Sequence, residues 1–462
     1  MYCFSTFWFT EGRAHCILIG HFVENWSKGA VMKKIFSPVW MRMCLVLVVA
    51  GFLGGCDALS GKTKIKISSW GDLNENSILV SEIADFEKLH PDIDVELERT
   101  PFNEYVTKLL TQISGGVAPD VIFCEVSLFG DFYYRHALEP LNTYMAADNF
   151  SLSDYYPQVI DRFTMDKQLY VIPRDTSPIG VIFYNKDAFD EAKVPYPTDD
   201  WNWNDFVAAA QKVMIKNEDG SVKRWGFVDD WAMSDNWVYG AGGSFVDDAK
   251  HPTKWTFATD PNTLKGIQFR ADLINKYKVM MPPTGNVAMG GLGNSDIFKN
   301  GMSAMFLSGY WKVPNFREIT KFKWDIVMQP QSPEGHRGFP TGGSGYGILS
   351  SSTHKQAAWE LIKYLSGVEG AKKMAATGLA VPVLMSVAKS PIFLDNQPPD
   401  NKKMILDAVQ YSVYNPLCVN WTEVHDGMMG PELDRVWNGT DTPEEAMEKI
   451  KPLLDKNPPA FQ

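Results

Sequence analysis

A short apolar run near the N-terminus, residues 44–52, constrains this chain more than any other segment. Lys33, Lys34 and Arg42 precede the run. Small residues follow it, directly before Cys56. A basic lead, a short apolar core and small residues before a cleavage point are typical of a bacterial export signal. The core is too short to span a membrane, which takes about 20 apolar residues, so the folded protein is expected to begin after it.

The end of this segment, Leu53-Gly54-Gly55-Cys56, resembles the lipobox of bacterial lipoproteins. The resemblance implies cleavage before Cys56 and a diacylglyceryl group on its thiol. The protein would then be lipid-anchored to the cell membrane and would face the periplasm or the exterior. The alternative is a plain secretory signal with an incidental cysteine. Residues 1–31 fit no export signal, so we expect Met32 to be the start and residues 1–55 to lie outside the fold.

The remaining length and charge narrow the class of protein. Of 462 residues, 407 follow residue 55, which is more than one hydrophobic core usually supports, so two lobes are expected. The whole chain carries −11, and residues 1–55 hold five basic and two acidic residues, which leaves −14 on the remainder. Nucleic-acid binding relies on lysine and arginine at phosphates, so we expect no nucleic-acid partner.

Two cysteines remain after Cys56. A disulfide between Cys124 and Cys418 is possible in an oxidising compartment. However, Cys124 directly follows the apolar residues 121–123, which favours a buried free thiol. No cysteine or histidine spacing indicates a metal site, and we expect no cofactor.

Strand and helix patterns alternate along the chain. Isoleucines at 65 and 67 and apolar residues at 93, 95 and 97 alternate with polar ones, as in strands, whereas residues 79–89 and 105–114 have helical spacing. This alternation predicts an α/β fold with a mostly parallel sheet. Further predicted elements are a strand at 180–184 and helices at 205–215, 262–277, 356–366 and 443–454.

Catalytic signatures are absent from the sequence. It contains no Walker A motif, no Rossmann glycine fingerprint, no Gly-x-Ser-x-Gly elbow and no zincin helix. The glycine-rich residues 342–347 do not open an obvious helix, so they make a poor phosphate cradle. We therefore expect no enzyme, although counting carboxylates alone does not exclude a glycosidase pair.

The order of motifs resembles the extracellular solute-binding proteins, family 1, of ABC importers, the maltose-binding-protein-like class. The resemblance covers nearly all of the chain after residue 55. The motifs are Ile-Ser-Ser-Trp-Gly-Asp (67–72), Phe-Glu-Lys-Leu-His-Pro (86–91), Gly-Gly-Val-Ala-Pro-Asp-Val-Ile (115–122), Ala-Leu-Glu-Pro-Leu (137–141), Tyr-Val-Ile-Pro (170–173), Phe-Tyr-Asn-Lys-Asp (183–187), Trp-Asn-Trp-Asn-Asp-Phe (201–206), Ala-Gly-Gly (241–243), Phe-Lys-Asn-Gly (298–301), Gly-Tyr-Trp (309–311), Gly-Gly (342–343), Ala-Ala-Trp-Glu-Leu-Ile-Lys-Tyr-Leu (357–365) and Gly-Leu-Ala-Val-Pro (378–382). The segment 185–201 departs from the family by its length and acidity.

The resemblance implies a two-lobed periplasmic-binding-protein fold of type II, with a ligand cleft between lobes joined by hinge crossovers. Crossovers are expected near residues 170–178, 285–293 and 329–341. The implied division is lobe 1 at 56–172, lobe 2 at 173–285, a return to lobe 1 at 286–330, and lobe 2 with C-terminal helices at 331–462.

The resemblance also implies which residues face the cleft. They are Trp70, Asp72, Glu125, Asp175, Trp231, Trp311, Gly342, Gly343, Tyr346 and Trp421. Aromatic rings would cover the apolar face of a sugar, and carboxylates would bond its hydroxyls. The alternative for the tryptophans is a core position, and for Glu125 a helix cap. The tyrosine pairs 133–134 and 155–156 leave ferric binding open.

The expected function is therefore the substrate-binding component of a carbohydrate ABC importer. It would be a monomer that captures a mono- or oligosaccharide by lobe closure and delivers it to permease subunits, touching the membrane only through its lipid. The alternatives are a binding protein for a glycerol phosphate ester or a polyamine, and a surface glycoside hydrolase.

Overall fold

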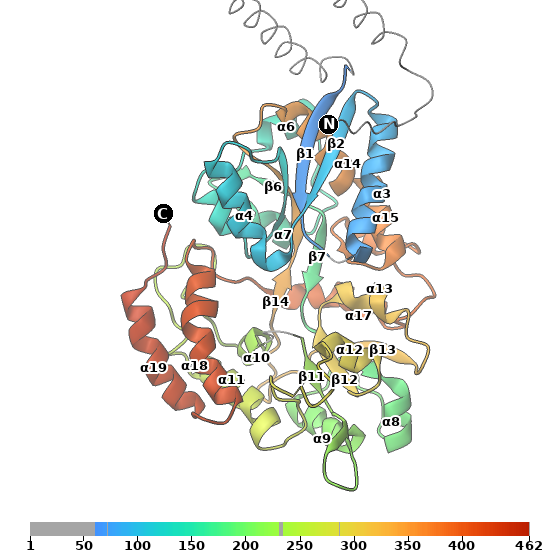
Figure 1. Cartoon of the computed structure of the whole chain (residues 1–462), viewed down its shortest axis with the longest axis vertical. Helices are drawn as coiled ribbons and strands as arrows, with labels where there is room; N and C mark the ends of the chain where they lie inside the picture. The colour runs from blue at the N-terminus through green and yellow to red at the C-terminus, as the bar shows by residue number, and fades with distance from the viewer. Residues whose placement is uncertain (1–60, 72, 231–233, 286, 462) are drawn as a thin grey trace, which may run out of the picture. The chain divides into compact units, whose positions relative to one another are not determined.

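A computed structural model of the chain describes residues 61–71, 73–230, 234–285 and 287–461. The predicted signal and Cys56 lie outside these residues. One compact unit spans Thr63–Gln462, and it contains two sheets, each with its own helices (Figure 1). We call the two assemblies the first and second lobes.

The first lobe is built on a five-stranded sheet with strand order β2-β1-β3-β15-β6. The strands are β1 (Thr63–Ser69), β2 (Ile93–Arg99), β3 (Val121–Glu125), β15 (Ser344–Ile348) and β6 (Val171–Pro173). β1 pairs with β2 and β3 in parallel, as predicted, whereas β15 is antiparallel to both of its neighbours. The alternating Ile65 and Ile67 are buried, which explains why this segment forms a strand.

Helices cover both faces of this sheet. In Figure 1, α3 (Leu73–Leu89) and α15 (Val368–Thr377) lie to the right of the sheet, and α4 (Phe102–Ser114) lies to the left. The helix α14 (Lys355–Ser366) contacts both α3 and β1. Phe86 and Trp359, from α3 and α14, are fully buried, so these apolar helix faces form the core of the lobe.

The second lobe has a four-stranded sheet with order β11-β12-β8-β13. The strands are β11 (Val228–Asp229), β12 (Met305–Ser308), β8 (Val181–Asn185) and β13 (Trp324–Met328), and β8 is antiparallel to both neighbours. Its longer helices are α9 (Trp203–Val213), α11 (Pro261–Asn275), α18 (Gly430–Trp437) and α19 (Pro443–Lys456). Capping boxes at Asn202 and Thr442 begin α9 and α19, because each side chain accepts a hydrogen bond from an otherwise unpaired backbone N–H.

Four short strands join the lobes in the order β16-β7-β14-β17. They are β7 (Asp175–Pro178), β14 (Phe339–Gly342), β16 (Val381–Pro382) and β17 (Ser412–Val413). β7 carries the chain from β6 to β8, and the antiparallel β14 carries it back into β15. β7 lies within the expected crossover range 170–178, whereas at the expected crossover 329–341 the chain passes into the first lobe rather than out of it.

The predicted return to the first lobe at 286–330 is wrong. This range contains α12 (Asn294–Lys299), β12 and β13, and both strands pair with β8 in the second sheet. The chain returns later, through β14, so that β15, α14 and α15 belong to the first lobe rather than the second. A short apolar strand does not itself indicate which sheet it joins, because only the pairing partner decides that.

The remaining elements are short. They are α5 (Phe129–Tyr133), α6 (Asn142–Ala147), α7 (Pro157–Arg162), β4 (Thr164–Met165), β5 (Gln168–Leu169), α8 (Lys186–Ala192), β9 (Ile215–Lys216), β10 (Val222–Arg224), α10 (Ser234–Gly240), a 3₁₀ turn η2 (Tyr310–Lys312), α13 (Val313–Phe316), α16 (Met385–Ala388), α17 (Lys402–Ala408), η3 (Val409–Tyr411) and a π-helix η4 (Glu423–Met429).

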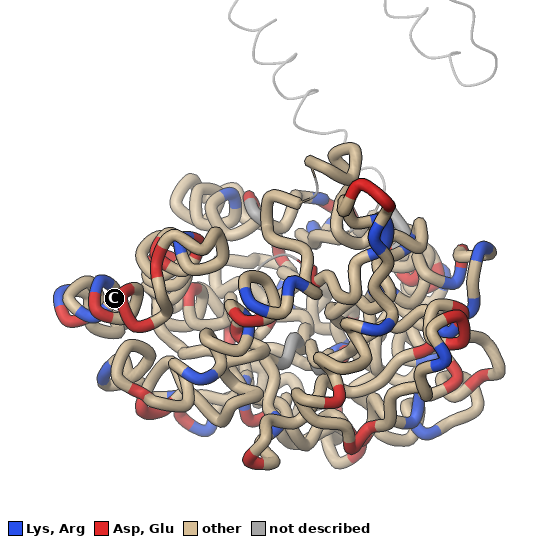
Figure 2. Tube along the Cα trace, turned by 90° about the horizontal axis from the view of Figure 1, so that it is seen from below, with Lys and Arg blue, Asp and Glu red and all other residues tan. Residues whose placement is uncertain are grey.

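Charged residues are distributed over the surface, and the two cysteines are buried. Acidic and basic residues are interspersed around the view in Figure 2, and pairs such as Lys265–Glu334 (3.0 Å) join some of them. Cys124 and Cys418 are buried free thiols, which confirms the interpretation that the sequence favoured. Among the described helices, none is both long and apolar enough to cross a membrane.

Candidate functional site

Trp70 lies at the carboxyl edge of the first sheet. It directly follows β1, and open α/β sheets bind ligands at the carboxyl ends of their strands. Its ring packs against the rings of Tyr105 (centroids 4.8 Å apart) and Phe123 (4.4 Å), yet the side chain stays partly exposed. The structure therefore holds this indole firmly and leaves part of it open to a ligand.

Glu125 ends β3 at the same edge and is also partly exposed. Its Oε2 accepts a hydrogen bond from Ser127 N (3.2 Å) and another from the Ser127 hydroxyl. Burial raises the pKa of Glu125 to about 7, against the opposing effects of Ser127 and the Arg162 cation. Near neutral pH this carboxyl is thus present in both forms, and it can accept or donate a hydrogen bond to a hydroxyl group.

Asp175 lies in the joint between the lobes. It is 2% exposed and accepts hydrogen bonds from Ser344 N (3.0 Å), Ser344 Oγ (2.6 Å) and Arg174 Nε (2.8 Å). Arg174 also pairs with Glu75 of α3 at 3.2 Å. These bonds connect β7 to the start of β15. Asp175 is therefore a buried part of the crossover and does not lie on an open surface.

The predicted glycine pair also lies at this joint. Gly342 ends β14 opposite Ser177. Gly343 is buried, and its carbonyl accepts a hydrogen bond from Val126 N at 3.0 Å. Both glycines therefore adjoin the edge that carries Glu125, through backbone contacts.

Tyr346 differs from the expectation of a cleft residue. It is fully buried in β15, with its ring 5.2 Å from that of Phe123. The glycines around it belong to a central strand: a Cβ on Gly345 would lie only 2.2 Å from the Ile172 carbonyl oxygen. This close approach of β6 explains why the segment is glycine-rich, and it places Tyr346 in the core.

Trp311 lies in η2, beyond the end of β12 in the second lobe. Its ring folds back over Gly309, where a Cβ would be 1.8 Å from the indole. The ring is partly buried and packs against an apolar cluster of Met374, Leu379 and Ala380. These three residues lie in α15 and just beyond it, so Trp311 bridges the two lobes.

A polar group that the sequence did not single out lies beside Trp311. Ser308 Oγ donates to Asp230 Oδ2 at 2.9 Å, and Lys312 Nζ lies 3.2 Å from the same oxygen. Ser308 ends β12 and Asp230 follows β11, so the group sits at the carboxyl edge of two parallel strands. The positions of Ser308 and Asp230 at strand ends were the available signal. Other polar residues also lie at strand ends, so this signal did not distinguish the group.

Trp421 belongs to the core of the second lobe. It is 6% exposed and packs against Phe245 (5.1 Å) and His425 (4.6 Å). His425 in turn bonds Asp235 (3.0 Å) and Asp426 (2.6 Å). Burial lowers the pKa of this imidazole, but the two carboxylates outweigh burial and raise it to about 10. In this structure, the core alternative applies to Trp421.

Two predicted site residues, Asp72 and Trp231, lie outside the described residues. The tyrosine pairs serve packing: Tyr155 Oη donates to the Ser366 carbonyl (2.8 Å), and Tyr133 Oη donates to Asp166 (2.8 Å). These bonds use the tyrosines at separate places in the first lobe.

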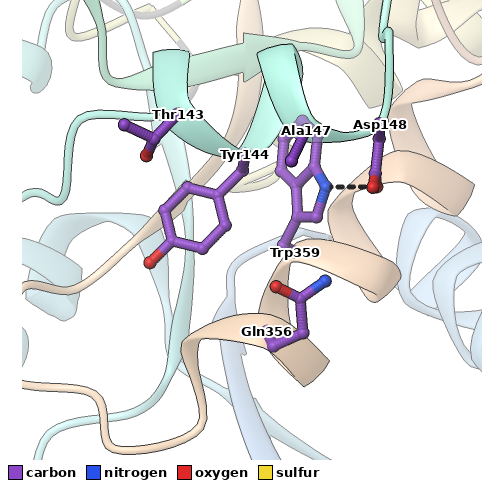
Figure 3. Close-up of a pocket in the computed structure, with 6 residues that line it drawn as sticks. All are labelled: Thr143, Tyr144, Ala147, Asp148, Gln356 and Trp359. Carbon is purple, nitrogen blue, oxygen red and sulfur yellow. Dashed lines mark hydrogen bonds between the residues drawn. The ribbon is translucent and has the colours of Figure 1, made fainter.

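A shallow pocket of about 340 Å³ lies between α6 and α14 (Figure 3). Trp359 Nε1 donates to Asp148 at 2.8 Å in its wall. The residues that line it are Thr143, Tyr144, Ala147, Asp148, Gln356 and Trp359. Because β15 is antiparallel to β3, α14 begins at the opposite edge of the sheet from Trp70, so this pocket is separate from the candidate site.

Comparisons with known proteins agree with this architecture. The bacterial extracellular solute-binding protein family matches residues 70–372. A solved ABC substrate-binding protein of Listeria monocytogenes, in complex with cycloalternan, is 29% identical, covers 86% of this chain and 98% of its own, and superposes with a TM-score of 0.77. Maltose-bound MalE3 of T. maritima is 24% identical over 85% of this chain and 99% of its own, with a TM-score of 0.73.

A relative from Bacillus subtilis, a galactooligosaccharide-binding protein, is 23% identical over 87% of this chain and 90% of its own length. The solved neighbours confirm the two-lobed fold of type II. The family match covers more than half of the chain, including the whole second sheet and every strand of the first sheet except β1. The chain belongs to the bacterial extracellular solute-binding protein family.

Proposed function

We propose that the chain is the substrate-binding component of a carbohydrate ABC importer, and that it captures an oligosaccharide between its lobes. The observation that carries the proposal is the 29% identical Listeria protein, which holds cycloalternan and is matched over nearly its whole length. The galactooligosaccharide-binding relative supports the same ligand class.

The candidate site has the chemistry that such a ligand needs. A sugar presents an apolar C–H face and a rim of hydroxyl groups. Trp70 and Trp311 supply rings from the two lobes, and Glu125, Asp230 and Lys312 supply groups that bond hydroxyls.

Closure of the lobes would report binding to the transporter. Ligand between the lobes favours the closed state by the difference in its affinity for the closed and open states. The antiparallel β7 and β14 are the paths about which the lobes would turn. The function needs no bond chemistry, so the protein would return its ligand intact.

Cys56 supplies the proposed attachment to the cell. Cleavage before Cys56 and lipidation of its thiol would hold a monomer at the membrane, facing the periplasm or the exterior, within reach of the permease subunits. The support is the lipobox-like sequence and the extracellular character of the family.

A thermal-shift panel tests the ligand class. Malto- and galacto-oligosaccharides and cycloalternan are compared with spermidine and glycerophosphocholine. A ligand at 100 times its Kd stabilises by about 2.7 kcal/mol, which raises the melting temperature measurably. A shift with spermidine or glycerophosphocholine, but with no saccharide, would overturn the carbohydrate proposal. Chromatography of the recovered sugar tests for turnover, and cleaved product would show an enzyme.

A further inference from the structure

Phe102, the first residue of α4, stands beside Trp70 and remains 41% exposed. The two ring centroids are 5.4 Å apart, and the ring planes meet at 70°. Trp70 follows β1, and Phe102 follows β2 after only two residues. Because β1 and β2 are adjacent parallel strands, the two rings share the carboxyl edge of the sheet.

The support behind the rings is rigid. Tyr105, which contacts Trp70, is fully buried, and its hydroxyl lies 2.9 Å from the Ser68 carbonyl oxygen and 2.8 Å from that of Phe123. Pro101 precedes Phe102 and restricts its own φ, here −55°. Binding of a ligand over these rings would therefore cost little conformational entropy, because the rings are already ordered.

We propose that Phe102 and Trp70 form a two-ring platform that binds two successive units of an oligosaccharide. The inference rests on the proposed carbohydrate function and adds to it a residue that decides ligand length. Sugar rings stack their C–H faces on aromatic rings. Since the two planes are inclined by 70°, one sugar face does not cover both rings, so a ligand that does must be longer than one unit and must bend between units.

Exposed phenylalanines also occur singly on protein surfaces without a ligand. Phe461 supplies that comparison within this chain. It is 38% exposed, and its ring lies edge-on to Tyr134, with centroids 5.1 Å apart and planes at 61°. It follows α19 rather than a strand of either sheet. Phe461 thus matches Phe102 in residue type, exposure and ring geometry, and differs in position.

The experiment is calorimetric titration of malto- and galacto-oligosaccharides, from the monosaccharide to the tetrasaccharide, into four proteins. These are the wild type, Phe102→Ala, Phe102→Leu and Phe461→Ala. Leucine keeps apolar cover over Trp70 but has no flat face, so it remains informative if the alanine variant folds poorly.

For the saccharides of two or more units that the wild type binds, both Phe102 variants should lose at least about tenfold in affinity, as when one aromatic contact of a ligand is truncated. The affinity of both Phe102 variants for any monosaccharide should fall by less than about twofold, and Phe461→Ala should bind all saccharides like the wild type.

Three results overturn the platform. Wild-type affinity in Phe102→Ala and Phe102→Leu would show that Phe102 touches no ligand. An equal loss at every ligand length would show that it acts only by seating Trp70. A wild type that binds monosaccharides alone would leave no second unit for Phe102. A wild type that binds no saccharide would instead overturn the proposed function, and the platform with it.

Discussion

Replacing Asp175 by alanine separates a structural role from a ligand contact. Asp175 is 2% exposed and Arg174 is 8% exposed, so the variant leaves a buried guanidinium without its nearest carboxylate. Removing one partner of a buried pair costs about 3–5 kcal/mol. Glu75 remains 3.2 Å from Arg174 and offsets part of the loss, so we expect the lower end, about 3 kcal/mol.

Urea unfolding of the ligand-free protein measures this cost. The midpoint should fall for Asp175→Ala, with a smaller fall for Asp175→Asn, which keeps an oxygen to accept from Ser344. Glu334→Gln is the control, because it removes a carboxylate that is paired with Lys265 on the surface. That variant should unfold at the wild-type midpoint.

Two results would contradict this reasoning. If Asp175→Ala unfolds at the midpoint of the control, the buried network does not stabilise the joint and the reasoning is refuted. If the midpoint is unchanged while saccharide affinity collapses, Asp175 is a ligand residue after all.

Trp311→Ala should weaken saccharide binding at least about 30-fold in calorimetric titration, since truncating an aromatic anchor of a binding site costs about 2 kcal/mol or more. Intact binding with a lowered urea midpoint would show that Trp311 packs the lobes together and does not contact the ligand. Burial raises the pKa of Glu125 to about 7 from 4.5, so the folded state keeps a proton that the unfolded state releases. Wild-type stability should therefore fall as pH rises from 4.5 to 7, and Glu125→Gln should flatten this fall in melts at pH 5 and pH 8. The remaining fall includes the part due to Glu82, whose pKa burial also raises to about 7, and, above pH 6.5, the part due to His425. An unchanged slope in Glu125→Gln would contradict the assignment. Cys56→Ala should abolish incorporation of radioactive palmitate in a bacterial host, and label retained in the variant would exclude Cys56 as the lipidated residue.

Local structure was largely predictable from the sequence. The alternation of Ile65 and Ile67 predicted β1, and the helical spacing at 105–114 predicted most of α4. The helix predicted at 262–277 corresponds to α11, which begins at Pro261 because the Asp260 side chain accepts a hydrogen bond from Asn262 N. Such signals are local, because capping and burial periodicity act within a few residues.

The site was predicted less well. Trp70 and Glu125 lie at the carboxyl ends of strands, as the resemblance implied, but Tyr346 and Trp421 lie in the hydrophobic cores of the first and second lobes. Phe102 was missed, because one phenylalanine after Pro101 has no distinctive spacing. Its neighbour Trp70 is 32 positions earlier in the printed sequence, and only the pairing of β1 with β2 brings the two together.

The sequence by itself determined the acidic net charge, most of the strand and helix segments and the family. The tertiary structure alone decided which sheet β12, β13 and β15 join, and hence which tryptophans bridge the lobes and which are buried. The physical reason is that a short apolar strand satisfies its hydrogen bonds equally well beside several partners. Its place is set by long-range packing that no local pattern encodes.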